Sequence, residues 1–314
     1  MKVITLVPVK NEAWILSDSL KNFCSFSDHI IVADQNSTDD TAAICSKFDK
    51  VTLIKNPYQA HTNQIRWLLL DEARKIEGNN IIVYLDADEL LSPVCINTIK
   101  EKINDLTSVV GFSADWIQLL NSYETYRVDG VWKNNYKEFA FIDNRIIDYD
   151  RTQITNDHSN RIPEIENIVH VSPPILHLQY LAKQRCDIKQ AFYMCTELLQ
   201  GRSPRKINYR YAVAMFSKKT KVEKTPDAWC ENIHLPNEQV FTLQDTIKLN
   251  QVLELFKEKG VLMFEPLNIW YIPELHKEFV KMTNREPKIK TYPKALVLIN
   301  NIKNSIKNGI LTKK

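Results

Sequence analysis

The sequence contains few cysteines and glycines, and it lacks patterns that would point to several common classes of protein. Its six cysteines form no CxxC pair, which favours reduced thiols in a folded core over a disulfide framework. Its six glycines form neither GxGxxG nor a P-loop. This absence argues against dinucleotide-binding and P-loop enzymes.

Long apolar runs are also missing. No run approaches the roughly 18–20 residues that a helix needs to span a bilayer. The first twelve residues, MKVITLVPVKNE, become polar too early for a signal peptide. We therefore expect a cytoplasmic protein.

Charge of one sign is not in large excess. The 41 Lys and Arg residues nearly balance 38 Asp and Glu residues, giving a net charge of +3. Nucleic-acid-binding proteins usually concentrate basic residues on one face, so we expect no nucleic-acid partner. With 314 residues, 44% of them hydrophobic, the chain can bury a core without disulfides or a structural metal.

The first 106 residues alternate between strand-like and helix-like patterns. Short apolar, β-branched runs at 2–8, 29–35, 51–55 and 81–85 each precede a segment with helical spacing. This alternation predicts the α/β class, with a mostly parallel sheet flanked by helices. In such sheets ligands bind at the carboxyl ends of the strands. Polar residues lie at these ends, in the segments 8–12, 34–36, 56–61 and 86–89.

The alternation of strand-like and helix-like segments ends after residue 107. Strand-like stretches with intervening loops predict a mixed or antiparallel extension of the sheet. An amphipathic helix follows over 181–200 and is closed by Gly201. Residues 203–235 are polar and basic, and two further helices are predicted at 243–259 and 293–309.

Two carboxylates follow the fourth predicted strand, in the sequence IIVYLDADE. Asp86 and Asp88 are separated by one residue, so they belong to a turn at the edge of the sheet. Paired carboxylates at this position suit Mg²⁺ or Mn²⁺ shared with phosphate oxygens. The alternative interpretation is a solvated acidic turn.

Four stretches of the first 106 residues carry distinctive motifs. They are VPVKNE at 7–12, VADQNSTDDT at 32–41, HTNQIRWLLLDEA at 61–73 and YLDADE at 84–89. In these motifs and their spacing, the chain resembles the family 2 glycosyltransferases with the GT-A fold. The resemblance is firm over 1–106, faint over 107–200 and absent beyond.

The resemblance implies a division of the chain and an activity. Residues 1–106 would bind the nucleotide sugar, 107–200 would form the acceptor side of the same GT-A domain, and 201–314 would be a helical C-terminal extension. The expected activity is metal-dependent, inverting transfer from a nucleotide-diphosphate sugar, with a UDP-sugar as the family default. The acceptor would be a hydroxyl of a glycan or glycolipid.

The resemblance also implies roles for residues at the nucleotide. Asp34 would accept hydrogen bonds from the base, with Pro8 and Glu12 near the base and ribose. Arg66 would lie beside the diphosphate. The alternatives are a turn-capping carboxylate for Asp34 and a surface helix charge for Arg66.

At the metal, the resemblance implies that Asp86 and Asp88 together hold the cation, with Asp88 as a direct ligand and Asp86 also facing the ribose or donor sugar. The family often adds a later histidine, for which His177 is the best match. A histidine within an apolar run is equally well explained as a core residue. His170 and His158 are poorer candidates.

An inverting transferase needs a general base near the acceptor hydroxyl. The family places its acceptor loop where this chain has NDHSNRIPE, residues 156–164. The chain departs from the family here, because the common His-Glu or Glu-Asp pair is missing. Asp157 is the first candidate, and Glu164 and His158 are the others. Each is also explained as a solvated loop residue.

Two further sequence features leave alternatives open. Trp116, Trp132, Tyr136 and Phe139 form either an acceptor platform or simply part of the core. Residues 295–314 combine apolar helical spacing with lysines, which suits either peripheral contact with an anionic membrane or a packed terminal helix.

Two other functional classes fit the sequence less well. A sugar nucleotidylyltransferase would carry a glycine-rich loop after the first strand, whereas VPVKNEAW has no glycine. A non-catalytic nucleotide- or glycan-binding protein on the same fold would be favoured by loss of the acids at 86 and 88. Both acids are present.

Overall fold

The fold is given by a computed structural model that describes residues 1–58, 62, 64–103, 110–151, 161–215 and 220–288. The chain divides into two compact units. The first comprises Met1–Tyr126, Asn134–Gln179 and Lys224–Val240. The second comprises Arg127–Lys133, Tyr180–Glu223 and Phe241–Lys314.

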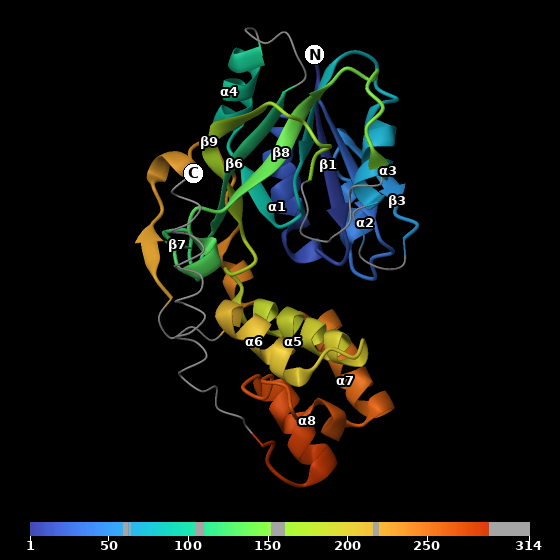
Figure 1. The fold of residues 1–314 in the computed structure, drawn as a ribbon, viewed down its shortest axis with the longest axis vertical. Helices are drawn as coiled ribbons and strands as arrows, with labels where there is room; N and C mark the ends of the chain where they lie inside the picture. Colours follow the sequence, from blue (N-terminus) through green and yellow to red (C-terminus); the bar gives the residue numbers. More distant parts are fainter. Residues whose placement is uncertain (59–61, 63, 104–109, 152–160, 216–219, 289–314) are drawn as a thin grey trace. The chain divides into compact units, whose positions relative to one another are not determined.

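The first unit is built on an eight-stranded sheet with the order β3-β2-β1-β4-β8-β6-β9-β5 (Figure 1). The strands are β1 Val3–Val9, β2 His29–Asp34, β3 Val51–Lys55, β4 Asn80–Tyr84, β5 Glu89–Leu91, β6 Gly111–Gln118, β8 Tyr136–Asp143 and β9 Ile168–His177. Its helices are α1 Ala13–Cys24, α2 Thr41–Cys45, α3 Gln64–Ala73 and α4 Pro93–Ile103. These elements confirm the predicted α/β class.

Strands β1 to β4 form the parallel half of the sheet. Successive side chains of a strand point to opposite faces. Val3 therefore packs in the same core as Leu16 and Leu20 of α1. Ile4 packs in another core with Leu69 of α3. Burial on both faces explains why β1, β2 and β4 read as continuous apolar runs, whereas β3, at the edge of the sheet, is partly exposed.

The helices of this half are shorter than their apolar spacing predicts. Helical spacing in the sequence predicts helices over 39–48 and 62–76. In the structure α2 covers Thr41–Cys45 and α3 covers Gln64–Ala73. Asp39 accepts hydrogen bonds from the backbone amides of Thr41 and Ala13. The acidic side chain therefore ties the start of α2 to the start of α1.

Residues after 107 extend the sheet with mixed pairing, as predicted. Strand β8 is antiparallel to β4 and β6, while β9 is parallel to β6 and antiparallel to β5. In this register His177 pairs with Glu89 of β5 and with Gln118 of β6. The last residue of β9 is thereby fixed at the turn that follows β4.

Gly111, at the start of β6, allows a close approach of apolar side chains from the segment that follows residue 160. A Cβ at this position would lie 2.5 Å from Cδ1 of Ile168 and 2.9 Å from Cδ1 of Ile162. We expect Gly111→Ala to lower the free energy of unfolding by about 1–3 kcal/mol, the usual cost of overpacking. Denaturant titration measures this loss, and an unchanged midpoint would contradict the prediction.

The second unit contains the helices α5 Lys183–Leu199, α6 Pro204–Met215, α7 Thr246–Lys259 and α8 Pro273–Thr283. Its core includes Ile188 of α5, Ile207 of α6, Phe256 of α7 and Phe279 of α8. Helix α5 packs with α6 and α7, which agrees with its place in the second unit.

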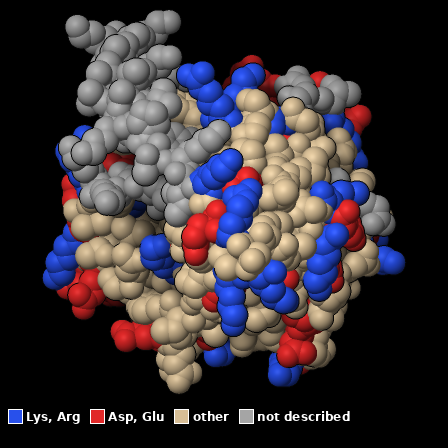
Figure 2. Space-filling model, turned by 90° about the horizontal axis from the view of Figure 1, so that it is seen from below, with Lys and Arg blue, Asp and Glu red and all other residues tan. Residues whose placement is uncertain are grey.

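Short strands β7 Thr125–Arg127 and β10 Val222–Lys224 pair with each other. The predicted helix 293–309 and the basic segment 295–314 lie outside the described residues. No described helix combines the length and apolar character required to cross a membrane. On the face drawn in Figure 2, acidic and basic side chains are interspersed among the described residues.

Candidate active site

The turn that joins β4 to β5 holds the two acids predicted from the sequence. The backbone amide of Asp86 donates to Oε2 of Glu89 at 2.9 Å, and the amide of Glu89 donates to the carbonyl of Asp86 at 3.1 Å. The amide of Leu178 donates to the carbonyl of Asp88 at 2.9 Å. Backbone bonds therefore hold the turn against the end of β9.

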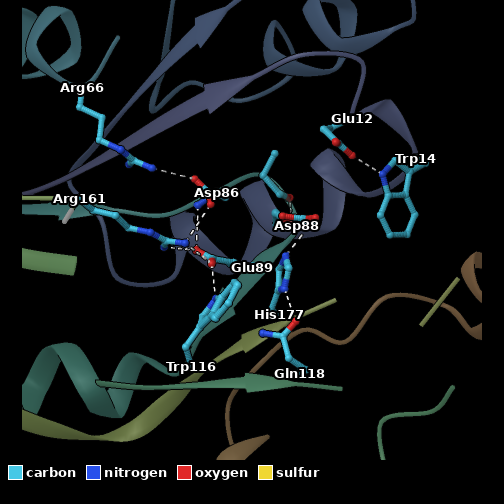
Figure 3. Close-up of polar contacts among 12 residues, drawn as sticks. Glu12, Trp14, Arg66, Asp86, Asp88, Glu89, Trp116, Gln118, Arg161 and His177 are labelled. Carbon is cyan, nitrogen blue, oxygen red and sulfur yellow. Dashed lines mark hydrogen bonds and ion pairs between the residues drawn. The ribbon is translucent and has the colours of Figure 1, made fainter. Parts of the chain in front are cut away.

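Glu89 is the buried centre of this site. Its side chain is 0% exposed, and Arg161 donates to both of its carboxylate oxygens at 2.6 Å (Figure 3). The indole N–H of Trp116 donates to Oε1 at 2.6 Å. A buried carboxylate must be paired and hydrogen-bonded to be tolerated, and Glu89 meets both conditions.

Asp86 lies between two guanidinium groups. Arg161 donates to its Oδ2 at 2.9 Å and Arg66 to its Oδ1 at 3.4 Å (Figure 3). Burial raises the pKa of this carboxyl, but Arg161 and Arg66 outweigh burial and hold the pKa below its usual range. Asp86 is therefore ionised at neutral pH, with 35% of its side chain exposed.

The two arginines differ in how fully they are paired. Burial disfavours the charged form of Arg161, but Asp86 and Glu89 outweigh this effect and raise its pKa. Burial lowers the pKa of Arg66 despite Asp86. The Nη1 of Arg66 is buried and has no hydrogen-bond partner among the described residues. Arg66 thus retains a donor for a ligand.

Asp88 and His177 face each other. Oδ2 of Asp88 lies 3.3 Å from Nε2 of His177, and their side chains are 9% and 8% exposed. Nδ1 of His177 lies 2.6 Å from Oε1 of Gln118, and the imidazole stacks on Trp116 with ring centroids 4.7 Å apart (Figure 3). Three side chains, those of Asp88, Gln118 and Trp116, therefore fix the orientation of this imidazole.

This pair has the chemistry of a divalent metal site. With Oε1 of Gln118 as acceptor, Nδ1 carries a proton and Nε2 is directed at the carboxylate of Asp88. An unprotonated imidazole nitrogen and a carboxylate oxygen are both common ligand atoms for a divalent cation. A hydrogen bond to the other ring nitrogen is also typical of metal-bound histidines.

The fit is incomplete at Asp86. Each of its oxygens already accepts a hydrogen bond from an arginine, which leaves fewer lone pairs for a metal but still allows Asp86 to accept from a ligand hydroxyl. Among the residues that the structure describes, no three His, Cys, Asp or Glu side chains converge as a metal-binding group. The Asp88–His177 pair would leave positions for diphosphate oxygens and water.

The residues predicted at the nucleotide lie at the ends of β1 and β2. The backbone amide of Gln35 donates to the carbonyl of Val9 at 3.0 Å, so these two strand ends are adjacent. Asp34 accepts from the hydroxyl of Ser37 at 2.5 Å and from its amide at 3.1 Å. The carboxylate is half-buried and is fixed as a cap of its own turn.

The turn that follows β1 is hydrogen-bonded to the segment that follows β2. Asn11, at a left-handed φ of 56°, accepts from the amide of Thr38 at 2.7 Å. Glu12 accepts from the indole N–H of Trp14 (Figure 3). Pro8 and Glu12 are both half-buried. Left-handed backbone is more accessible to Asn than to most residues, which explains the absence of glycine from this turn.

Within the described part of the chain, the structure does not place a general-base candidate at the site. Asp157 and His158 lie outside the described residues, and Glu164 is exposed. Of the aromatic residues considered for an acceptor platform, Phe139 is fully buried core and Tyr136 is 59% exposed. His170 is exposed and lies 3.6 Å from Asp115, away from the Asp88 carboxylate that contacts His177.

Lys137 of β8 also faces this site. Its ammonium lies 4.7 Å from the ring centroid of Trp116. Burial is the main cause that lowers the pKa of Lys137, followed by the charge of Arg161, while Glu89 and Asp86 oppose the shift. The ammonium is thus within electrostatic reach of the Asp86–Glu89 turn.

Sequence reasoning missed the roles of Arg161, Glu89 and Gln118. One signal was present: Glu89 begins an apolar run, and a buried carboxylate requires a cationic partner. The partner itself could not be chosen, because Arg161 is 72 positions away in the chain.

Comparison with known proteins agrees with the motifs. The family model for glycosyl transferase family 2 matches residues 5–155. This match, which spans slightly less than half of the chain, confirms the resemblance found in the sequence. The mostly parallel sheet flanked by helices agrees with the GT-A fold expected for that family.

Individual relatives are distant. An uncharacterized glycosyltransferase of Rickettsia conorii is 31% identical over 91 residues, which cover 29% of this chain and 30% of that protein. The crystal structure of S. aureus TarS 1-349 is 13% identical, covering 90% of this chain and 88% of its own, with a TM-score of 0.41.

A second solved structure matches a smaller part. Glucosyl-3-phosphoglycerate synthase from Mycobacterium tuberculosis, in complex with Mn²⁺, UDP and glucosyl-3-phosphoglycerate, is 17% identical. The match covers 36% of this chain and 44% of that chain, with a TM-score of 0.28. This chain thus spans less than half of that protein and about a third of the Rickettsia conorii relative.

Proposed function

We propose that this protein is a metal-dependent, inverting glycosyltransferase that uses a nucleotide-diphosphate sugar, with UDP-sugar as the first candidate donor. The acceptor is proposed to be a hydroxyl group of a glycan or glycolipid. The match to the family 2 model over residues 5–155 supports the class of reaction. The Asp88–His177 pair carries the proposal, because its buried carboxylate oxygen and imidazole nitrogen lie 3.3 Å apart and are both suitable ligands for one divalent cation.

The proposed roles follow the position of each group. Asp88 and His177 hold Mn²⁺ or Mg²⁺, and Arg66 directs its unpartnered Nη1 to the diphosphate. When bound, the cation supplies Lewis-acid stabilisation of the diphosphate. Asp86 is held by Arg66 and Arg161 and is proposed to accept from a hydroxyl of the ribose or donor sugar.

The nucleoside is proposed to bind at the ends of β1 and β2. Asp34 would accept from the base, and Pro8 and Glu12 would line the base and ribose. Asp34 is already oriented by Ser37, so base binding would need little rearrangement. Residues 1–106 would then be the donor-binding half and 107–200 the acceptor side, with 201–314 a helical extension.

Transfer is proposed to be a direct displacement. A base removes the proton of the acceptor hydroxyl, the oxygen attacks the anomeric carbon, and the bond to the diphosphate breaks on the opposite face. Inversion follows from this geometry. Asp157 is the first candidate for the base, with Glu164 and His158 as the others, because all three belong to the expected acceptor loop.

A thermal-shift screen tests the proposed function. UDP with Mn²⁺ is expected to raise the melting temperature, because a ligand at 100 times its Kd adds about 2.7 kcal/mol to the stability of the folded form. ATP, NAD and oligonucleotides serve as comparison ligands. Asp88→Asn should remove the Mn²⁺-dependent part of the shift. If no nucleoside diphosphate stabilises the protein in the presence of Mn²⁺, the proposal is wrong.

A further inference from the structure

Near the Asp86–Glu89 turn lies a cation, the ammonium of Lys137, for which the described residues provide no hydrogen-bond or ion-pair partner. Lys137 is half-buried on β8, where it pairs with Ala114 of β6, two residues before Trp116. Its ammonium lies over the Trp116 ring, the same ring that stacks on His177. Among the described residues, no hydrogen bond or ion pair reaches Nζ of Lys137.

The other cations of the site differ in this respect. Arg161 is bound by the carboxylates of Glu89 and Asp86. Arg66 is bound by Asp86, although one of its guanidinium nitrogens stays unpartnered. A half-buried ammonium costs desolvation energy that the face of one indole ring offsets in part. Lys137 is therefore placed to bind an anion.

A count of charges indicates which anion. Arg161 balances Glu89, and Arg66 balances Asp86. Asp88 and a divalent cation together leave one positive charge, and Lys137 adds a second. A nucleotide sugar carries two negative charges on its diphosphate, which these two positive charges match. The departing nucleoside diphosphate gains a further negative charge on its terminal phosphate as the sugar leaves.

We infer that Lys137 binds the terminal phosphate of the nucleoside diphosphate and stabilises the charge that develops there during transfer. The inference rests on the proposed function and assigns a residue to it. An ammonium already fixed against an aromatic ring needs little reorganisation as charge develops, which is the usual source of electrostatic catalysis. The bond that breaks joins the anomeric carbon to this phosphate, and the electron pair goes to the phosphate oxygen.

Binding of UDP and of UMP, each with Mn²⁺, tests the inference by calorimetry. UMP lacks the terminal phosphate. Lys137→Met and Lys137→Gln are expected to weaken UDP binding roughly 10- to 100-fold, the effect of losing one charge-assisted contact. Binding of UMP is expected to change less than twofold. Lys137→Arg should retain most of the affinity for UDP, and Lys100→Met, on the exposed side of α4, should behave as wild type.

The outcomes separate this inference from the proposed function. If the wild-type protein binds no nucleoside diphosphate with Mn²⁺, the proposed function fails and the inference fails with it. If wild type binds UDP and both neutral variants bind it equally well, only the inference is overturned. An equal loss for UMP and UDP also overturns it, because the lysine would then act on the nucleoside end. A melting curve for each variant verifies that it folds.

Discussion

Replacing Asp88 with alanine is expected to abolish sugar transfer while the protein stays folded. Asp88 contributes the carboxylate of the buried pair with His177, and its backbone carbonyl accepts from Leu178 independently of the side chain. Removing a metal ligand forfeits several kcal/mol of transition-state stabilisation, so kcat should fall by about three orders of magnitude or more. Turnover is measured with the donor sugar that the thermal-shift screen identifies.

Two comparisons make this prediction specific. Asp88→Asn keeps the size of the side chain, removes its charge and should lose comparable activity. Asp18→Asn provides a matched control, because Asp18 forms a surface ion pair with Lys21 on α1. Near-normal turnover by Asp88→Ala, with Mn²⁺ still raising the melting temperature, would show that the metal binds elsewhere.

Replacing Arg161 with methionine is expected to have the largest effect on stability. Its side chain is 5% exposed and neutralises Glu89, whose side chain is 0% exposed. Removing one partner of a buried ion pair leaves an uncompensated charge, which typically costs about 3–5 kcal/mol. The free energy of unfolding, measured by denaturant titration, should fall by this amount.

The exposed pair Arg151–Asp71 gives a direct control. Both side chains are 44% exposed, and their N–O distance of 2.6 Å equals that between Arg161 and Glu89. Because exposed pairs contribute about 0–1 kcal/mol, Arg151→Met should change stability little. Combining Arg161→Met with Glu89→Gln should recover part of the loss, since the buried charge is then absent. Equal effects of Arg161→Met and Arg151→Met would refute the assignment of Glu89 as a buried, ionised partner.

The parallel half of the fold follows from the sequence because its signals are local. Apolar runs of strand length, separated by segments with helical spacing, define β1 to β4 and the helices between them. The ends of the helices were less predictable: α2 starts at Thr41, where the side chain of Asp39 also ties the chain to α1 through Ala13. Such a cap depends on a neighbour 26 positions away in the chain.

The candidate site, like the fold, was predictable from the sequence only in part. The sequence by itself marked Asp86 and Asp88 as chemically important, because acids after a buried strand are visible in a single stretch, whereas His177 was singled out by the resemblance to the family. The tertiary structure decided that Asp88 and His177 face each other, since this depends on the pairing of β9 with β5 and β6. It also decided that Asp86 is held by two arginines and that Glu89 is buried against Arg161. Periodicity along the chain specifies which side chains face inward, whereas the partner of a buried charge is chosen through space, by strands that meet only when the whole sheet has formed.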